Sequence, residues 1–536
     1  MNKHLYRLVW RHCRVDVVPA PETARQSAGA PASRVRRARC GTRSSSLLPG
    51  SLTRVCLACI ALLGAVASAP VWATCTATGN VVTCSGAANP LAPSYANAAN
   101  NLQVNVGSGA GVGVLLGIGG TAMSLTGNNV TLVNGGTIDP SLLGGIGLLA
   151  SGTFIGNATP GGSTQTVTNN AIMRGTVGIL GVSLPGLTGL ALAVQNATGG
   201  TTVINNGGTL GATPLLGVSL TGNGSAPVAA AYGGSVVNFT NSGTVLGRIA
   251  FQASGTPGTG NTFTNEGALS GSVSLGANST NTFTAVTGST LDDGGSTGLG
   301  ALSVTGFNLG FAATGVVDGG AGGNNSLVLR NSANNASTTG TGTFNGASYL
   351  NFSQATVSGG TWTLHGPLAV TSTTLNGGLA IFDDPGSFGT GSLTVNGGAM
   401  QAASAGLSIA LPVTLGANGL TVSGANPLTL SNTVTGNGGV SLTGTSSLTL
   451  LGINTYSGGT SLTSGTLIAG SNSALGSGAV QVSGTAGVLD ANAPVTLANG
   501  IAIGGGSTLT LGGSAPLTLS GQISGGGSLT KQGAQT

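Results

Sequence analysis

The chain has 536 residues and a formal net charge of +5, but 11 of its 15 Lys and Arg residues lie within the first 73 positions. The other 463 residues hold four basic and eight acidic side chains, a net charge of −4, which excludes a nucleic-acid-binding surface built on positive charge. A hydrophobic content of 40% in alternating order argues against disorder despite 99 glycines.

Residues 1–73 are predicted to be a targeting segment. Their first part, Met1–Trp10 (MNKHLYRLVW) with Val17–Val18 and Glu22–Arg25, resembles the extended signal peptide region of large Gram-negative secreted proteins. The resemblance covers about 25 residues and is interrupted at Arg11–Arg14, where the family has a polar stretch. The resemblance implies export from the cytoplasm. It does not distinguish autotransporters, trimeric adhesins and two-partner exoproteins, since all three classes carry this extension.

An apolar stretch at 55–73 (VCLACIALLGAVASAPVWA) follows Arg54 and ends in small residues. This pattern predicts signal cleavage between Ala73 and Thr74, with a weaker alternative after Ala69. A transmembrane anchor is the competing interpretation, but its small residues and the lack of a following basic stop disfavour it. Lipid attachment at Cys59 is rejected because almost no apolar run precedes that residue.

Cys75 and Cys84 are the only cysteines after residue 73, within the segment CTATGNVVTC. In an oxidising compartment they are expected to form a disulfide that closes a hairpin. We assign residues 74–127 to an N-terminal cap and the first turns of a solenoid.

Residues 128–300 contain a repeated Asn-Gly pattern, as in VNGGTI at 133–138 and INNGGTL at 204–210. Asn134, Asn170, Asn206 and Asn241 lie 36, 36 and 35 residues apart, and NTFT recurs after 20 residues at 261–264 and 281–284. A rung of 18–20 residues, sometimes counted in pairs, fits both intervals and indicates a solenoid. Asparagines at one point of successive rungs are expected to stack as an amide ladder.

Residues 301–400 are less regular and contain the strongest candidates for catalytic residues. His365 is the only histidine after residue 73, and Asp383–Asp384 follow about one rung later, which is raw material for a Ser-His-Asp site. No G-x-S-x-G segment supports catalysis, so a solvated histidine on a turn is favoured. The other acidic pair, Asp292–Asp293, points to opposite faces of a strand and does not converge.

The same region contains a possible calcium site. The segment at 318–327 (DGGAGGNNSL) resembles one calcium-binding nonapeptide repeat, but it occurs once and has Asn324 where the motif needs Asp. A tight turn is the favoured interpretation, and we predict no metal and no cofactor.

Residues 401–536 alternate Leu or Val with Ser or Thr in short bursts that end at Gly, Asn or Ser, the pattern of short half-buried strands. The segment 447–460 (SLTLLGINTYSGGT), followed by SGTL at 464–467, resembles the passenger-associated transport repeat of bacterial autotransporters over about 30 residues. The motif positions are Leu448, Leu450, Gly452, Asn454, Tyr456, Gly458, Gly459, Thr460, Gly465 and Leu467. The resemblance implies a right-handed parallel β-helix exported through a C-terminal outer-membrane barrel.

The sequence therefore predicts an all-β chain, a right-handed parallel β-helix behind a cleaved signal region. The function expected from the resemblance is that of an exported passenger acting as a non-catalytic surface adhesin or interaction rod. The alternatives are a hydrolytic passenger centred on His365 and an exoprotein of a two-partner system. A trimeric adhesin is disfavoured because no heptads for a coiled-coil stalk occur. The expected partners are the inner-membrane export machinery and an unidentified host-surface or self-association ligand.

At 525–533 (GGGSLTKQG) another transport repeat begins, and the sequence stops before its TYSGGT-like part. Because no strands with the aromatic girdles of a membrane barrel follow, the sequence is expected to be a truncated or fragmentary autotransporter. We expect such a chain to collect in the periplasm, whereas a chain supplied with a barrel reaches the cell surface or is secreted.

Overall fold

The computed structural model describes residues 6–11, 14–19, 74–87, 94–113, 120–140, 151–175, 189–211, 223–296, 298–304 and 309–533. The chain divides into two compact units, Met1–Ala69 and Pro70–Thr536. In the first unit, β1 (Tyr6–Arg11) pairs antiparallel with β2 (Arg14–Pro19). Within these described ranges, no helix is long and apolar enough to cross a membrane.

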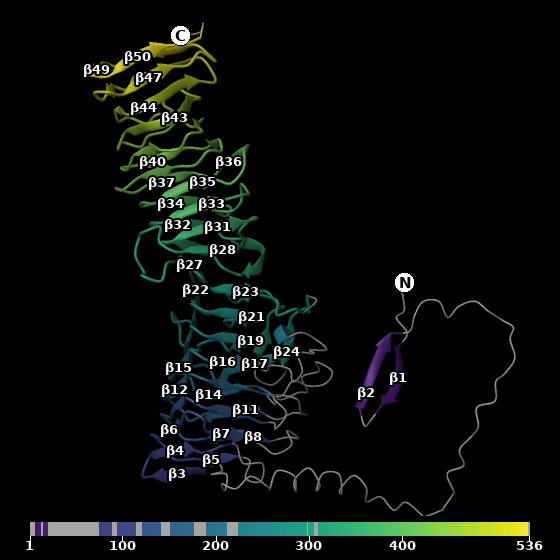
Figure 1. The fold of residues 1–536 in the computed structure, drawn as a ribbon. Helices are drawn as coiled ribbons and strands as arrows, with labels where there is room; N and C mark the ends of the chain where they lie inside the picture. Colours follow the sequence, from purple (N-terminus) through teal and green to yellow (C-terminus); the bar gives the residue numbers. More distant parts are fainter. Residues whose placement is uncertain are drawn as a thin grey trace, which may run out of the picture. The chain divides into compact units, whose positions relative to one another are not determined.

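The second unit is a parallel β-helix, in which strands stack as successive rungs from β3 to β50 (Figure 1). Its first sheet, sheet 1, has 15 strands, and all its pairings are parallel except the first, between β3 and β4. In stacking order they are β3 (Thr74–Thr78), β4 (Val81–Ser85), β6 (Gln103–Val106), β9 (Thr131–Asn134), β12 (Thr164–Asn169), β15 (Thr201–Asn206), β18 (Val236–Asn241), β20 (Thr262–Asn265), β22 (Thr282–Val286), β27 (Ser326–Arg330), β30 (Gln354–Val357), β32 (Ser372–Leu375), β34 (Ser392–Val395), β37 (Val413–Leu415) and β40 (Val434–Gly436).

Sheet 2 has 14 strands, all paired in parallel, and belongs to the N-terminal part of the β-helix. Its members are β5 (Tyr95–Asn97), β7 (Gly111–Gly113), β8 (Thr121–Leu125), β10 (Thr137–Asp139), β11 (Ser151–Gly156), β13 (Ile172–Met173), β14 (Leu192–Gln195), β16 (Thr209–Gly211), β17 (Pro227–Tyr232), β19 (Thr244–Phe251), β21 (Ala268–Ser274), β23 (Thr290–Asp292), β26 (Val317–Asp318) and β29 (Tyr349–Leu350).

Sheet 3 has 15 parallel strands and belongs to the C-terminal part. They are β28 (Thr341–Asn345), β31 (Thr361–His365), β33 (Leu379–Phe382), β35 (Ala399–Ala402), β36 (Leu407–Ile409), β38 (Leu420–Val422), β39 (Leu428–Leu430), β41 (Val440–Leu442), β42 (Ser447–Leu450), β43 (Thr460–Ala469), β44 (Val480–Ala491), β46 (Ile501–Ile503), β47 (Thr508–Leu511), β49 (Ile523–Gly525) and β50 (Ser528–Lys531). The remaining elements are an antiparallel pair, β24 (Leu302–Val304) and β25 (Leu309–Phe311), a parallel pair, β45 (Val495–Leu497) and β48 (Leu517–Leu519), and two single 3-10 turns, η2 (Asn223–Ser225) and η3 (Gly346–Ser348).

Alternation of side chains along each strand fills the core, as in β12, β15 and β18, where every second residue is buried. Aromatic rings stack along the axis in the same way. The rings of Phe239 and Phe263 lie with their centroids 4.7 Å apart, and those of Phe263 and Phe283 lie 5.6 Å apart. Since each rung packs against its neighbours, the core lengthens without thickening.

A ladder of buried asparagine amides runs along sheet 1, but its second member is Asn169 and not Asn170. The side-chain Nδ2 of Asn134, Asn169, Asn206 and Asn241 donates to the Oδ1 of the next asparagine at 2.8, 2.7, 2.8 and 2.9 Å, ending at Asn265. The predicted Asn170 is exposed because it follows the inward-facing end of β12.

The predicted rung length is also wrong for this part of the chain. The register pairs Asn134 with Asn169, Asn169 with Asn206 and Asn206 with Asn241, so one rung takes 35 to 37 residues there. Rungs of 20 residues, such as Thr262 to Thr282, appear only farther along. Long connections between the strands of sheet 2 account for the difference, and a spacing of 36 therefore marks one turn of the coil.

Candidate functional site

The two cysteines after the signal lie opposite one another in the first hairpin. The predicted cleavage residue Ala73 falls outside the described residues, and Thr74 is the first residue of β3. Cys75 and Cys84 are cross-strand partners in the antiparallel pair β3–β4 and are joined by a disulfide, with their Cα atoms 4.0 Å apart. The bond lies at the first rung of sheet 1. It joins β3 to β4 through the side chain of Cys84, which is buried in the core.

Thiol labelling of the exported protein tests this pair. We expect no free thiol before reduction and two thiols per chain after reduction under denaturing conditions, because only Cys75 and Cys84 follow the predicted cleavage point. Full labelling of unreduced native protein would contradict the disulfide. A Cys75→Ser, Cys84→Ser double variant serves as the zero-signal control.

The transport-repeat motif consists of core side chains and turn residues. Leu448, Leu450 and Leu467 are fully buried, and the hydroxyl of Tyr456 lies 2.6 Å from Thr460 Oγ1 within the core. Burial raises the pKa of Tyr456 to about 12, so its hydroxyl stays protonated. The motif thus supplies apolar contacts in two successive rungs, where Leu448 of β42 pairs with Leu467 of β43, and one buried hydroxyl pair.

Asn454 connects this rung to both of its neighbours. Its Oδ1 accepts the backbone N–H of Val434 at 2.7 Å, and its Nδ2 donates to the carbonyl of Ala474 at 2.6 Å. The glycines fit close turns: a Cβ at Gly452 or Gly458 would collide with backbone of the preceding rung, while Gly459 and Gly465 have a φ of +78°. The contacts described for these motif residues are structural.

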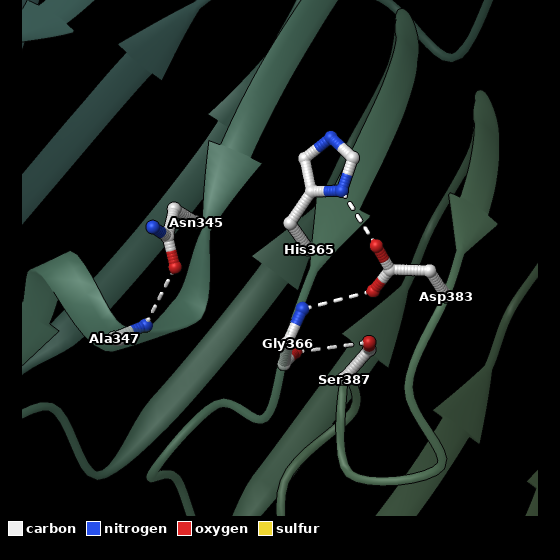
Figure 2. Close-up of polar contacts among 6 residues, drawn as sticks. All are labelled: Asn345, Ala347, His365, Gly366, Asp383 and Ser387. Carbon is white, nitrogen blue, oxygen red and sulfur yellow. Dashed lines mark hydrogen bonds and ion pairs between the residues drawn. The ribbon is translucent and has the colours of Figure 1, made fainter.

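His365 and Asp383 come together at the ends of neighbouring strands. β31 and β33 pair in register at Leu364 and Phe382, which places the next residue of each strand side by side. Figure 2 shows the contact: His365 Nδ1 lies 2.6 Å from Asp383 Oδ2, and the backbone N–H of Gly366 donates to Asp383 Oδ1 at 2.9 Å. The side chains are 48% and 37% exposed.

These contacts define the protonation states of the pair. The hydrogen bond with His365 and that from Gly366 lower the pKa of Asp383 below its ordinary value. The ionised carboxylate only accepts, so Nδ1 of His365 carries a proton and Nε2 is an acceptor in the neutral ring. A depressed carboxyl pKa contributes stability at neutral pH that is lost as the pH falls through the folded-state value.

Serine, the third member of a catalytic triad, does not join the pair. Ser387 is 2% exposed and donates its hydroxyl to the Gly366 carbonyl at 3.0 Å, and the imidazole ring points away from it (Figure 2). No hydroxyl within the described residues bonds to Nε2 of His365. The arrangement supplies an oriented general base without a nucleophile beside it.

The other acidic residues of the sequence analysis serve local turns. Asp292, Asp293, Asp318 and Asp384 each accept the backbone N–H of the residue two positions on, at 2.7 to 2.9 Å. Asp318 also accepts from Asn351 Nδ2 at 2.7 Å. Such Asx turns occupy carboxylate oxygens in holding the backbone. Among the described side chains, no group of three or more His, Cys, Asp or Glu could hold a metal ion.

Sequence reasoning missed a buried arginine. Arg248 is almost fully buried in β19, and among the described residues its guanidinium donates to the backbone carbonyls of Gly300, Ala312 and Leu299 at 2.8, 3.3 and 3.4 Å. Burial lowers its pKa. The available signal was a lone basic residue inside the apolar run 244–251 (TVLGRIAF). These hydrogen bonds connect the segment that contains β24 and β25 to β19 of the β-helix.

Comparison with known families identifies the signal region. Residues 1–51 match the family described as the extended signal peptide of type V secretion system. No curated protein and no solved structure gives a significant match to the chain. The match to an extended signal peptide of type V secretion supports an exported protein, and the parallel β-helix that follows is consistent with an autotransporter passenger.

Proposed function

We propose that the exported β-helix is a non-catalytic adhesin, an interaction rod that binds a partner at the cell surface through the outer face of sheet 1. The observation that carries this proposal is a column of outward-facing side chains, eight threonines and one valine. In register, the column is Thr240, Thr264, Thr284, Val328, Thr356, Thr374, Thr394, Thr414 and Thr435.

The chemistry of the column suits a polar, uncharged ligand. Its hydroxyls repeat at the strand spacing of about 4.8 Å, and each β-branched side chain has few rotamers, so little order is lost on binding. The strands β18 to β37, which carry all but the last residue of the column, are each hydrogen-bonded to a neighbour on both sides, so the backbone beneath these side chains is rigid. Glycan, protein and a second copy of the chain all remain compatible with such a face, and the experiment separates them.

Binding of the exported protein to cultured host cells, to a glycan array and to itself tests the role. We expect saturable binding to one of the three, reduced at least tenfold by Thr264→Lys, Thr284→Lys and Thr374→Lys together. A matched triple variant on strands of sheet 3, Thr421→Lys, Ser441→Lys and Thr449→Lys, should bind as the parent does. Absence of binding to all three targets would refute the adhesin.

A hydrolase is the second candidate, and the contact of 2.6 Å between His365 and Asp383 favours it. A half-exposed imidazole with an acceptor at Nε2 could activate a water molecule or a substrate hydroxyl. Because no nucleophilic side chain among the described residues is bonded to the imidazole, we propose the adhesin first.

Turnover of ester and peptide substrates separates the two functions. We expect the purified exported protein to hydrolyse neither substrate above background, and His365→Ala to change nothing. Asp383→Asn is the matched variant, since it removes the carboxylate that orients the imidazole. Hydrolysis by the parent that is lost in both variants would overturn the non-catalytic role.

A further inference from the structure

Two successive rungs of the β-helix lack one of their strand pairings, that between β23 and β28. β23 pairs only with β21, and β28 pairs only with β31. The same two rungs are paired before and after this break, through β22 with β27 and through β26 with β29. A hydrogen bond from Gly288 N to Thr341 O at 2.9 Å connects the two rungs just before β23 and at the first residue of β28. The break therefore separates two strand edges that belong to neighbouring rungs.

A groove of about 370 Å³ lies at this break. Its lining is Gly288, Ser289, Thr290, Leu291, Thr341, Gly342, Thr343, Asn345, Ser348 and Tyr349. The volume is at the lower end for ligand sites in proteins, enough for a few residues and too small for a folded domain. None of the lining side chains carries a charge.

The two edges turn unpaired backbone groups toward the groove. Thr290 N donates to Gly267 O, toward β21, and alternate residues of a parallel strand face opposite neighbours, so the N–H and C=O of Leu291 face away from β21. In the same way, Thr361 N donates to Gly340 O, which leaves the N–H and C=O of Thr343 facing away from β31. These are the groups that a further strand would bond.

The groove also contains a polar atom without a partner. Tyr349 is 6% exposed and lines the groove, packed against Phe344 and Phe283 with ring centroids 4.3 and 5.7 Å away. No described residue forms a hydrogen bond with its hydroxyl. Burial raises the pKa of Tyr349, so the hydroxyl remains a donor throughout the physiological range.

We propose that this groove binds an extended polypeptide segment of a partner protein, which adds as a short strand to the edges of β23 and β28. The occupant is a peptide because the unpaired groups are backbone N–H and C=O in strand geometry, continuous with the ladders on both sides of the break. Its central residues are small and uncharged, matching the lining. β28 has five residues, which sets the length of the bonded segment. The inference deepens the proposed binding role and rests on it for its biological setting.

Trp362 provides a direct reporter of binding. Its ring lies against the backbone of Gly342 in the groove wall, where an added Cβ would collide with it. Replacement of Trp10 and Trp72 by phenylalanine leaves Trp362 as the only tryptophan of the full chain. The probe is the blocked pentapeptide TVSVT, and its fully N-methylated form is the control. We expect a saturable change in tryptophan emission with the first peptide and none with the second, because N-methylation removes the backbone donors.

Variants separate backbone recognition from other effects. Thr343→Pro removes one groove-facing N–H and should weaken binding at least tenfold, whereas Thr343→Ala keeps that N–H, shortens a groove-lining side chain and should weaken binding by about twofold or less. Tyr349→Phe removes only the hydroxyl and should weaken binding about fivefold, the effect of one hydrogen bond. An unchanged emission spectrum without peptide verifies the fold of each variant.

No saturable change with TVSVT, or equal binding of its N-methylated form, would show that the groove holds water only and would overturn the proposal. Cell, glycan or self binding that persists in Thr343→Pro and Tyr349→Phe leaves the adhesin standing without this site. Loss of that binding in Thr343→Pro but not in Thr343→Ala places the groove in the interaction.

Discussion

Asn206→Ala should lower the free energy of local opening of the surrounding rungs by about 3–5 kcal/mol. Asn206 accepts from Asn169 and donates to Asn241 Oδ1 and to the Thr244 carbonyl, at 2.7, 2.8 and 3.2 Å, in a buried position. Its removal takes the donor from Asn241 Oδ1, one of two acceptors from Asn169 Nδ2 and one donor from the Thr244 carbonyl, at a cost of roughly 1–3 kcal/mol for each group left unpaired before relaxation. Hydrogen exchange followed by mass spectrometry measures the loss of protection in β12, β15 and β18.

The neighbouring residue supplies a matched control. Asn205 is the same residue type one position earlier, and it is exposed. Asn205→Ala should change the protection of these strands by less than about 0.5 kcal/mol, as is usual for surface substitutions. Equal effects of the two variants would refute an energetic role for the ladder.

Tyr456→Ala should lower the free energy of local opening of the rungs around β42, β43 and β44 by about 3–5 kcal/mol. The ring is fully buried, so truncation forms a cavity as well as removing apolar contact. It also leaves the hydroxyl of Thr460 without the partner it has at 2.6 Å. Because a solenoid rung contacts only its neighbours, the loss should remain local. The exchange experiment above reports both its size and its extent.

Two further substitutions divide that effect into its parts. Tyr456→Phe keeps the ring and should cost about 1–2 kcal/mol, the value of one buried hydrogen bond. Thr455→Ala, at the exposed position before it, should be nearly neutral. If Tyr456→Ala were no worse than Tyr456→Phe, the ring would not be the main contribution of this motif residue to stability.

Alternation and repeat spacing are local properties and were sufficient to predict a solenoid of short strands, while the resemblance to autotransporter passengers implied the parallel β-helix. VTLVN at 130–134 and TVTNN at 166–170 contain the same alternating pattern, and they pair as β9 and β12. The exact register was harder to predict. Asn169 and Asn170 are adjacent and identical, and only the inward orientation at the end of β12 distinguishes the ladder member. A shift of one residue changes the face on which a side chain lies.

Prediction of the candidate sites was less complete for a physical reason. The separation of 18 residues between His365 and Asp383 predicted their approach, since it equals one short rung. The role of Ser387 was not predictable, because its hydroxyl bonds a carbonyl of another rung. The break between β23 and β28 depends on a ten-residue connection after Arg330, whose path no periodic pattern encodes.

The register of the parallel strands has a consequence for folding kinetics. Partners such as Thr361 and Leu379 are 18 residues apart, and the wider pair Thr282 and Ser326 is 44 residues apart. These separations are short compared with the length of the chain, so the relative contact order is low for a protein made of strands. Closing loops of this size costs only logarithmically more as they lengthen. An unfolded chain can therefore fold by adding one rung at a time to the rungs already formed. Each strand pairs with a strand nearby in the sequence, so its folding does not depend on distant segments.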